Sequence, residues 1–179
     1  ALTLLVGVLL WALPALAQVW TYTGSMGTDR RNATVTQLQD GRVLVVGGML
    51  ANSNTFLATA EIYDPETCQF VPTGSLKTGA RALHTATLLN DGKVLVAAGY
   101  VGGGPTFNFK TAEIYDPTTG QFTETGSLSI GRSQHAATLL YDGTVLITGG
   151  YDTIGATRQG EIYDPISGTF SNTNNIMLH

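Results

Sequence analysis

The sequence predicts an all-β fold built from three four-stranded antiparallel sheets arranged around an axis. Three observations support it: motifs that recur three times, a strand-and-turn pattern inside every copy, and a composition suited to tight turns. The 179 residues include 22 glycines, and only 12% are charged. Such a composition favours short strands and tight turns over a helical bundle.

The copies follow one another at intervals of about 51 residues. Asp-Gly pairs stand at 40–41, 91–92 and 142–143, and the apolar run after each pair ends at Gly48, Gly99 and Gly150. Glu-Ile-Tyr-Asp-Pro recurs at 61–65, 113–117 and 161–165, and Thr-Gly-Ser at 23–25, 73–75 and 125–127. Because four motifs keep one order through three copies, each copy is interpreted as one structural unit.

The first two strands of a unit are predicted on either side of the Asp-Gly pair. The first covers 82–89 and 133–140 in the second and third copies, and Asp-Gly supplies the positive φ that a tight hairpin needs. The second covers 43–46, 94–98 and 145–148, which are mainly aliphatic runs without polar alternation. This pattern indicates a strand that neighbouring sheets cover on both faces.

The third strand is predicted over 59–63, 111–115 and 160–163, where Asp-Pro ends it because proline cannot donate to a ladder. The fourth strand is short and begins at Phe70, Phe122 and Phe170. Asp64, Asp116 and Asp164 precede proline and are expected to shape turns rather than bind calcium.

The repeat resembles the kelch family, in its secreted form related to the central domain of galactose oxidase, from about residue 20 onward. The resemblance rests on a glycine pair followed by a tyrosine and, seven residues later, an aromatic residue. The residues are Gly47, Gly48, Gly99, Gly149 and Gly150, with Tyr63/Phe70, Tyr115/Phe122 and Tyr163/Phe170. Two features depart from the family: phenylalanine replaces the usual tryptophan, and Ala98 replaces the first glycine of the second pair.

The resemblance implies a partial β-propeller with blades at 28–77, 78–128 and 129–179. Closed kelch rings usually have about six or seven blades, so three leave the ring open. The remaining blades of a longer chain, or a second copy of this one, would have to cover the exposed sheet faces. The last residues stand where a fourth copy would begin, which favours a fragment. Residues 18–27 are expected to form an N-terminal strand that could close the ring.

Residues 1–17 are interpreted as a signal peptide, which predicts a secreted or periplasmic protein with no membrane attachment after cleavage. Residues 2–13 are almost wholly apolar, and Pro14 and Ala15-Leu16-Ala17 follow, a small-x-small cleavage pattern. A buried strand or a membrane anchor is the alternative, and Pro14, the cleavage pattern and the polar sequence that follows argue against an anchor. The missing initiator methionine, with Arg30 as the first positive charge, indicates a lost N-terminus.

Charge and cysteine content narrow the classes of partner. The formal net charge is -4 and no basic run is present, so nucleic acid is not expected as a partner. The single cysteine, Cys68, excludes a disulfide or a cysteine-rich metal cluster within this sequence. It stands at the position of Gly120 and Gly168, which predicts an exposed turn residue, with a reactive or cross-linked thiol as the alternative.

Arginine, histidine and glutamate recur at equivalent positions. His84 and His135 lie three residues after Arg81 and Arg132, whereas the first copy has Arg30 but Ala33. These groups could grip an anionic or sugar ligand near the axis, or they could satisfy backbone carbonyls between blades. Glu61, Glu113 and Glu161 could act in acid/base catalysis or form hydrogen bonds between blades. Repetition favours the structural interpretation in both cases, because a catalytic site needs different residues from different blades.

The connections between second and third strands, 49–58, 100–110 and 151–159, vary while their flanks repeat, as expected of a binding surface carried on a scaffold. Their aromatic residues are the contact candidates: Phe56, Phe107, Phe109 and Tyr151. The alternative is that these rings only cover hydrophobic edges.

We therefore expect a binding module for a protein or carbohydrate, without a cofactor. The resemblance also admits a copper-radical oxidase of sugars or alcohols, or a sugar isomerase. An oxidase would need a Tyr–Cys pair with His and Tyr copper ligands near the axis, an asymmetry that these blocks lack. A self-assembling structural module is the third hypothesis.

Overall fold

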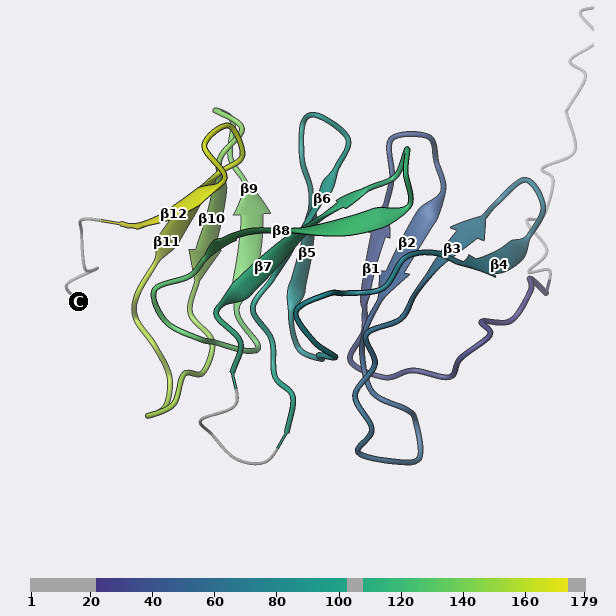
Figure 1. Cartoon of the computed structure of the whole chain (residues 1–179), viewed down its shortest axis with the longest axis horizontal. Helices are drawn as coiled ribbons and strands as arrows, with labels where there is room; N and C mark the ends of the chain where they lie inside the picture. Colours follow the sequence, from purple (N-terminus) through teal and green to yellow (C-terminus); the bar gives the residue numbers. More distant parts are fainter. Residues whose placement is uncertain (1–21, 103–107, 174–179) are drawn as a thin grey trace, which may run out of the picture.

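A computed structural model describes residues 22–102 and 108–173, which form three four-stranded sheets and no helix. The sheets stand side by side like blades, with the chain passing from one to the next (Figure 1). The strands are β1 (Thr34–Gln37), β2 (Val43–Val46), β3 (Ala60–Asp64), β4 (Gln69–Pro72), β5 (Thr85–Leu88), β6 (Val94–Ala97), β7 (Thr111–Asp116), β8 (Gln121–Ser127), β9 (Ala136–Leu139), β10 (Val145–Thr148), β11 (Glu161–Asp164) and β12 (Thr169–Asn172). None of the described segments is a helix long and apolar enough to cross a membrane.

Each sheet is an antiparallel meander in which every strand pairs with its neighbours in sequence. The all-β prediction is confirmed, and the strands follow the predicted patterns closely. The first strands are shorter than predicted, because Leu83 and Gln134 adopt positive φ and interrupt the ladder. Before these residues, Ala82 and Ser133 each form only an isolated bridge to the next connection.

The turns show why Asp-Gly and Asp-Pro recur. The hairpin glycines Gly41, Gly92 and Gly143 have φ between 83° and 88°, a region that glycine enters without a Cβ clash. The aspartate before each accepts a hydrogen bond from the backbone N–H two residues on, as Asp91 does from Lys93. Asp116 accepts one in the same way from Thr118 in the turn between β7 and β8.

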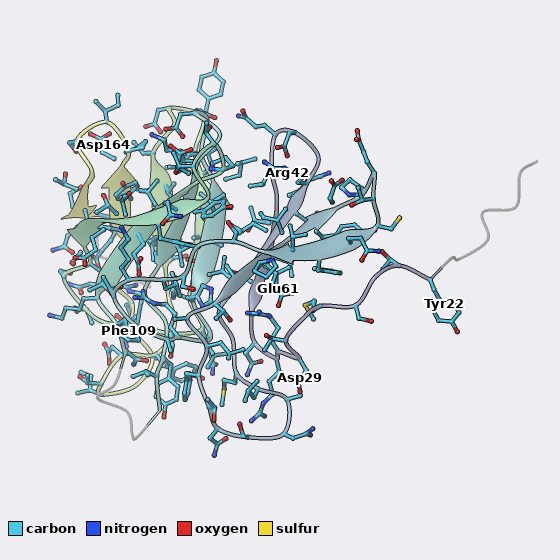
Figure 2. All side chains as sticks on the ribbon, turned by 45° about the vertical axis from the view of Figure 1, so that its right-hand side comes forward. Tyr22, Asp29, Arg42, Glu61, Phe109 and Asp164 are labelled. Carbon is cyan, nitrogen blue, oxygen red and sulfur yellow. The ribbon has the colours of Figure 1, made fainter. Side chains whose placement is uncertain are left out.

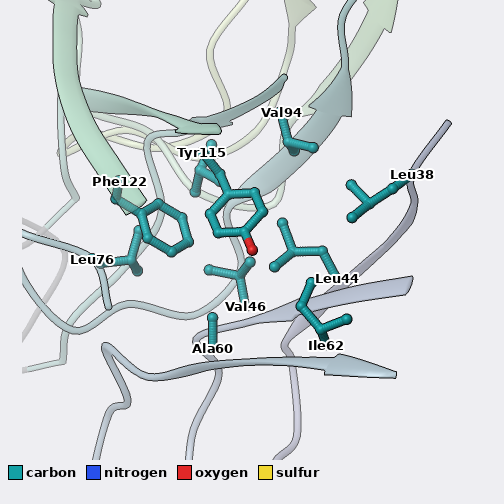
Figure 3. Packing of buried hydrophobic residues seen from close by; sticks show 10 residues of the cluster. Leu38, Leu44, Val46, Ala60, Ile62, Leu76, Val94, Tyr115 and Phe122 are labelled. Carbon is teal, nitrogen blue, oxygen red and sulfur yellow. The ribbon is translucent and has the colours of Figure 1, made fainter. Parts of the chain in front are cut away.

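Apolar side chains join each blade to the next. We call the face of a blade that meets the next blade along the chain its back face, and the opposite face its front face. The back face of blade 1 carries Leu38, Leu44, Val46, Ala60 and Ile62, which pack with Val94, Val96, Tyr115 and Phe122 from the front face of blade 2 (Figure 3). The back face of blade 2 meets the front face of blade 3 equivalently, through Leu89, Leu95, Ala97, Ala112, Val145, Ile147 and Tyr163. Both junctions are therefore built from repeat-equivalent residues.

The two outer blade faces are uncovered in the described chain. On the front face of blade 1, Val35 is 69% exposed, and a hollow of about 290 Å³ is lined by Val43, Val45, Tyr63 and Phe70. On the back face of blade 3, Leu146 and Ile162 are half-buried, whereas their equivalents in blade 1 are buried. Apolar surface that is core between blades thus faces outward at both ends.

The Thr-Gly-Ser motif fastens each linker to the following blade. Thr73 Oγ1 lies 2.9 Å from the Tyr115 hydroxyl, and the Gly74 N–H donates to Gly120 O at 2.9 Å. A Cβ on Gly74 would collide with that carbonyl oxygen, which explains the glycine.

The segment before blade 1 makes the same contacts. Thr23 Oγ1 lies 2.7 Å from the Tyr63 hydroxyl, and the Gly24 N–H donates to Cys68 O. Residues 22–27 are not in a strand, and the remainder of the expected strand at 18–27 and the expected signal peptide at 1–17 lie outside the described residues. The segment 22–28 therefore occupies, relative to blade 1, the place of an inter-blade linker.

Candidate functional site

Every blade contains one buried ion pair between its repeated arginine and glutamate. The distances between Nη2 and Oε1 are 2.6 Å for Arg30 and Glu61, and 2.9 Å for Arg132 and Glu161. Arg81 and Glu113 lie 3.5 Å apart, and both side chains are fully buried. Glu61, labelled in Figure 2, lies in the interior of blade 1 beside the incoming linker.

The glutamates also hold the linkers. Each accepts a backbone N–H from the segment that enters its blade: Gly27 donates to Glu61 at 2.7 Å, Lys77 to Glu113 at 2.8 Å and Ser129 to Glu161 at 2.8 Å. Burial of a carboxylate is costly unless the group is paired and hydrogen-bonded, and these contacts supply both kinds of partner. These contacts give the glutamates a structural role.

The arginines donate to carbonyls within their own blade, rather than between blades as one sequence interpretation held. Arg81 Nη1 donates to Ala98 O and Thr111 O, both at 3.1 Å, on either side of the connection between β6 and β7. Its guanidinium also lies 4.3 Å from the centroid of the Phe109 ring. Burial lowers the pKa of Arg81 to about 10, against the opposing effect of Glu113, so the group stays charged at neutral pH.

Each histidine makes a side-chain bond to the preceding blade. His84 Nε2 lies 2.9 Å from Thr34 Oγ1 in blade 1, and His135 Nε2 lies 2.9 Å from Thr85 Oγ1 in blade 2. Burial lowers the pKa of His84 to about 3, with added repulsion from Arg81 and His135. Burial and Arg132 lower that of His135 to about 4. Both rings are therefore neutral at physiological pH and offer no positive charge to an anionic ligand.

The four loop candidates have different environments. Phe56 is half-buried and packs edge-on against Tyr100, with 5.7 Å between ring centroids. Phe109, labelled in Figure 2, is half-buried, and the Arg81 guanidinium lies over its ring. Tyr151 is 54% exposed, whereas Phe107 lies outside the described residues. Tyr151 is thus the described candidate best placed to meet a partner.

The structure adds residues that the sequence argument missed. Ile154 is 94% exposed on the same connection as Tyr151, and Asn108 crosses from blade 2 to donate to Tyr151 O at 3.0 Å. The connections that carry these residues project from one side of the blades, which we call the loop face, while the Asp-Gly hairpins project from the other (Figure 1). Aligning the copies could have pointed to Asn108, since it stands where the first copy has Phe56.

Cys68 lies at the position expected for it. It is exposed and has φ of 57° in the turn between β3 and β4, where Gly120 and Gly168 have φ of 68° and 66°. Within 22–102 and 108–173, no group of three or more His, Cys, Asp or Glu side chains is arranged to hold a metal ion.

Comparison with known proteins agrees with the repeat architecture. The family model of the kelch motif matches residues 30–77 and 81–129, which together are more than half of the chain. No curated protein sequence matches it. Blade 3 repeats the buried ion pair, the linker contact and the Tyr–Phe ring pair of the matched blades. Kelch repeats are commonly protein-interaction modules. The chain belongs to the kelch-repeat family.

Proposed function

We propose that this chain is part of an exported, non-catalytic propeller that binds a partner protein through its loop face. The observation that carries the proposal is the contrast between a uniform scaffold and a variable surface. Arginine, glutamate and tyrosine make the same contacts in every blade, while the connections on the loop face differ. Variable loops on a rigid frame are the usual means by which a scaffold presents a specific binding surface.

Exposed apolar side chains on the loop face support this proposal. Tyr151 and Ile154 belong to one connection and are exposed together. Exposed aromatic and aliphatic side chains on a preformed surface can serve as anchors in protein recognition. A carbohydrate ligand is the alternative occupant of the same surface.

Export and ring closure belong to the same proposal. Export rests on the apolar segment with its small-x-small cleavage pattern at the start of the sequence. Ring closure rests on the uncovered faces of blades 1 and 3, which match faces that are buried at the inner junctions. Further kelch sheets, from a longer chain or from a second copy, would bury these faces.

The loop face can be tested against the hairpin face of the same molecule. Tyr151→Ala with Ile154→Asp alters the loop face, and Tyr141→Ala with Ile166→Asp makes the same changes on the hairpin face at residues that are at least as exposed. The immobilised chain and both variants are exposed to proteins released by the source organism, with crosslinking and mass spectrometry as readout. We expect a protein that the wild type and the hairpin-face variant retain and the loop-face variant loses. Equal retention by both variants, or loss only from the hairpin-face variant, would contradict the proposal.

A further inference from the structure

A notch opens between blades 2 and 3 on the loop face. It has a volume of about 440 Å³, and Leu83, Tyr100, Asn108, Gln134, Tyr151 and Ile154 are among the residues that line it. The lining residues come from the connections of both blades and from the residues just before β5 and β9. The notch contains aromatic and aliphatic carbon beside two side-chain amides, two aliphatic hydroxyls and the Asp152 carboxylate, and no arginine or lysine of the described residues lines it.

The equivalent space between blades 1 and 2 is filled by an aromatic ring of the chain itself. Phe56 reaches from blade 1 and packs against Tyr100 of blade 2, with an interplanar angle of 72° and 5.7 Å between centroids. Gly102 leaves room for this ring, since a Cβ on Gly102 would lie 2.8 Å from a Phe56 ring carbon. An edge-to-face pair of this kind is a favoured aromatic arrangement.

Asn108 replaces that ring at the next junction. Phe56 bridges to Met49 and Asn108 bridges to Tyr100, so the two residues occupy equivalent places in their blades. The shorter Asn108 side chain instead donates from Nδ2 to the main-chain oxygen of Tyr151. No phenylalanine of the described residues packs over Tyr151, the equivalent of Tyr100, and Tyr151 is 54% exposed, whereas Tyr100 is half-buried.

We propose that this notch receives an aromatic side chain from the partner protein, which packs edge-on against Tyr151 as Phe56 packs against Tyr100. The inference rests on the proposed protein-binding function and specifies the chemistry of the partner at this position. The chain provides the precedent for the fit, because its own phenylalanine occupies the matching space one blade earlier. Leu83 and Ile154 supply apolar contacts, and the lining carries the Asp152 carboxylate and, among the described residues, no lysine or arginine, which favours a neutral ring over an anionic group.

The first test uses short probes and the full chain. N-acetyl-Gly-Trp-Gly-amide, its leucine counterpart and methyl β-D-glucopyranoside are titrated separately while amide shifts are followed by NMR. We expect the aromatic peptide to bind at least fivefold more tightly than the leucine peptide, with the largest shifts near Tyr151. Equal binding of the two peptides, or shifts elsewhere, would overturn the inference. Binding of the glucoside at the notch without the aromatic peptide would assign the site to a sugar instead.

Variants of the notch give the second test. Asn108→Phe places a ring where Phe56 lies in the preceding blade, and Tyr151→Ala removes the aromatic surface. Each should weaken binding of the aromatic peptide about tenfold or more. Tyr141→Ala, which alters a fully exposed tyrosine on the hairpin face, should leave it unchanged. Thermal unfolding confirms that each variant is folded, and Tyr151→Ala decides the question if Asn108→Phe does not fold.

The two proposals fail in different ways. Unchanged peptide affinity in folded Tyr151→Ala would overturn the notch alone, provided that the loop-face double variant still loses its captured partner. Retention of that partner by the loop-face double variant would contradict the proposed function, whatever the short peptides do.

Discussion

His84 of blade 2 and Thr34 of blade 1 are in hydrogen-bond contact across the junction of the two blades, with 2.9 Å between Nε2 and Oγ1. The ring is buried among groups that disfavour its charged form, and its pKa falls to about 3. His135 and Thr85 repeat this contact at the next junction, where the pKa of His135 falls to about 4. The folded chain therefore binds these protons less readily than the unfolded chain does.

Stability should decrease in mild acid because of this difference. A histidine whose folded pKa is depressed contributes its full stabilisation above the unfolded value of about 6.5, and loses it progressively as the pH falls toward the folded value. Between pH 6 and pH 5 the free energy of unfolding should fall by up to about 1.4 kcal/mol per pH unit for each histidine. Urea unfolding at several pH values would measure this slope, which should be smaller in the double variant His84→Asn with His135→Asn. Parallel profiles would contradict the assignment.

The buried ion pairs should be costly to break. Glu161→Gln keeps the shape of the side chain but leaves Arg132 charged in an interior site without its carboxylate, which should destabilise the fold by about 3–5 kcal/mol. Asp40→Asn is the matched control, because the Asp40–Arg42 pair is exposed and worth about 1 kcal/mol or less. Chemical denaturation of both variants would give the difference, and equal losses would show that burial does not set the contribution of these pairs.

Replacing Cys68 with glycine, the residue at the equivalent positions 120 and 168, should stabilise the fold. Its backbone is left-handed, which costs a residue with a Cβ about 1–2 kcal/mol, and glycine removes that cost while adding about 0.5–1 kcal/mol of unfolded-state entropy. Because Cys68 is exposed, Cys68→Gly removes no buried packing and should stabilise the fold by about 0.5–1 kcal/mol. Gly168→Ala tests the same position in blade 3 and should destabilise it. A loss of stability in Cys68→Gly under reducing conditions would point to a contact of the thiol instead.

Features that depend on local physics were predictable from the sequence. The aliphatic runs at 43–46 and 145–148 became β2 and β10 at the predicted bounds, and the hairpin glycines took positive φ. The role of Thr-Gly-Ser was not predictable, since Gly74 meets a carbonyl in the following blade at Gly120. A repeated motif shows that a contact exists, but only the coordinates identify the partner.

The notch was hidden for a related reason. Comparing the copies shows that Phe56 and Asn108 differ, but not that both side chains cross to the next blade. The burial of Phe56 was not predictable either, because Tyr100, which covers it, belongs to the next blade and follows 44 positions later in the sequence. The repeated motifs predict the scaffold, whereas the candidate site lies where Asn108 departs from the repeat.

Blade 1 also departs from the repeat at Ala33, which occupies the position of His84 and His135 in the later blades. A sheet seated on blade 1 would meet the hydrocarbon of Val43 and Val45 there, and blade 1 would offer it no histidine at that position. Acid that protonates His84 and His135 at the two inner junctions would therefore find no equivalent group of blade 1 on its outer face.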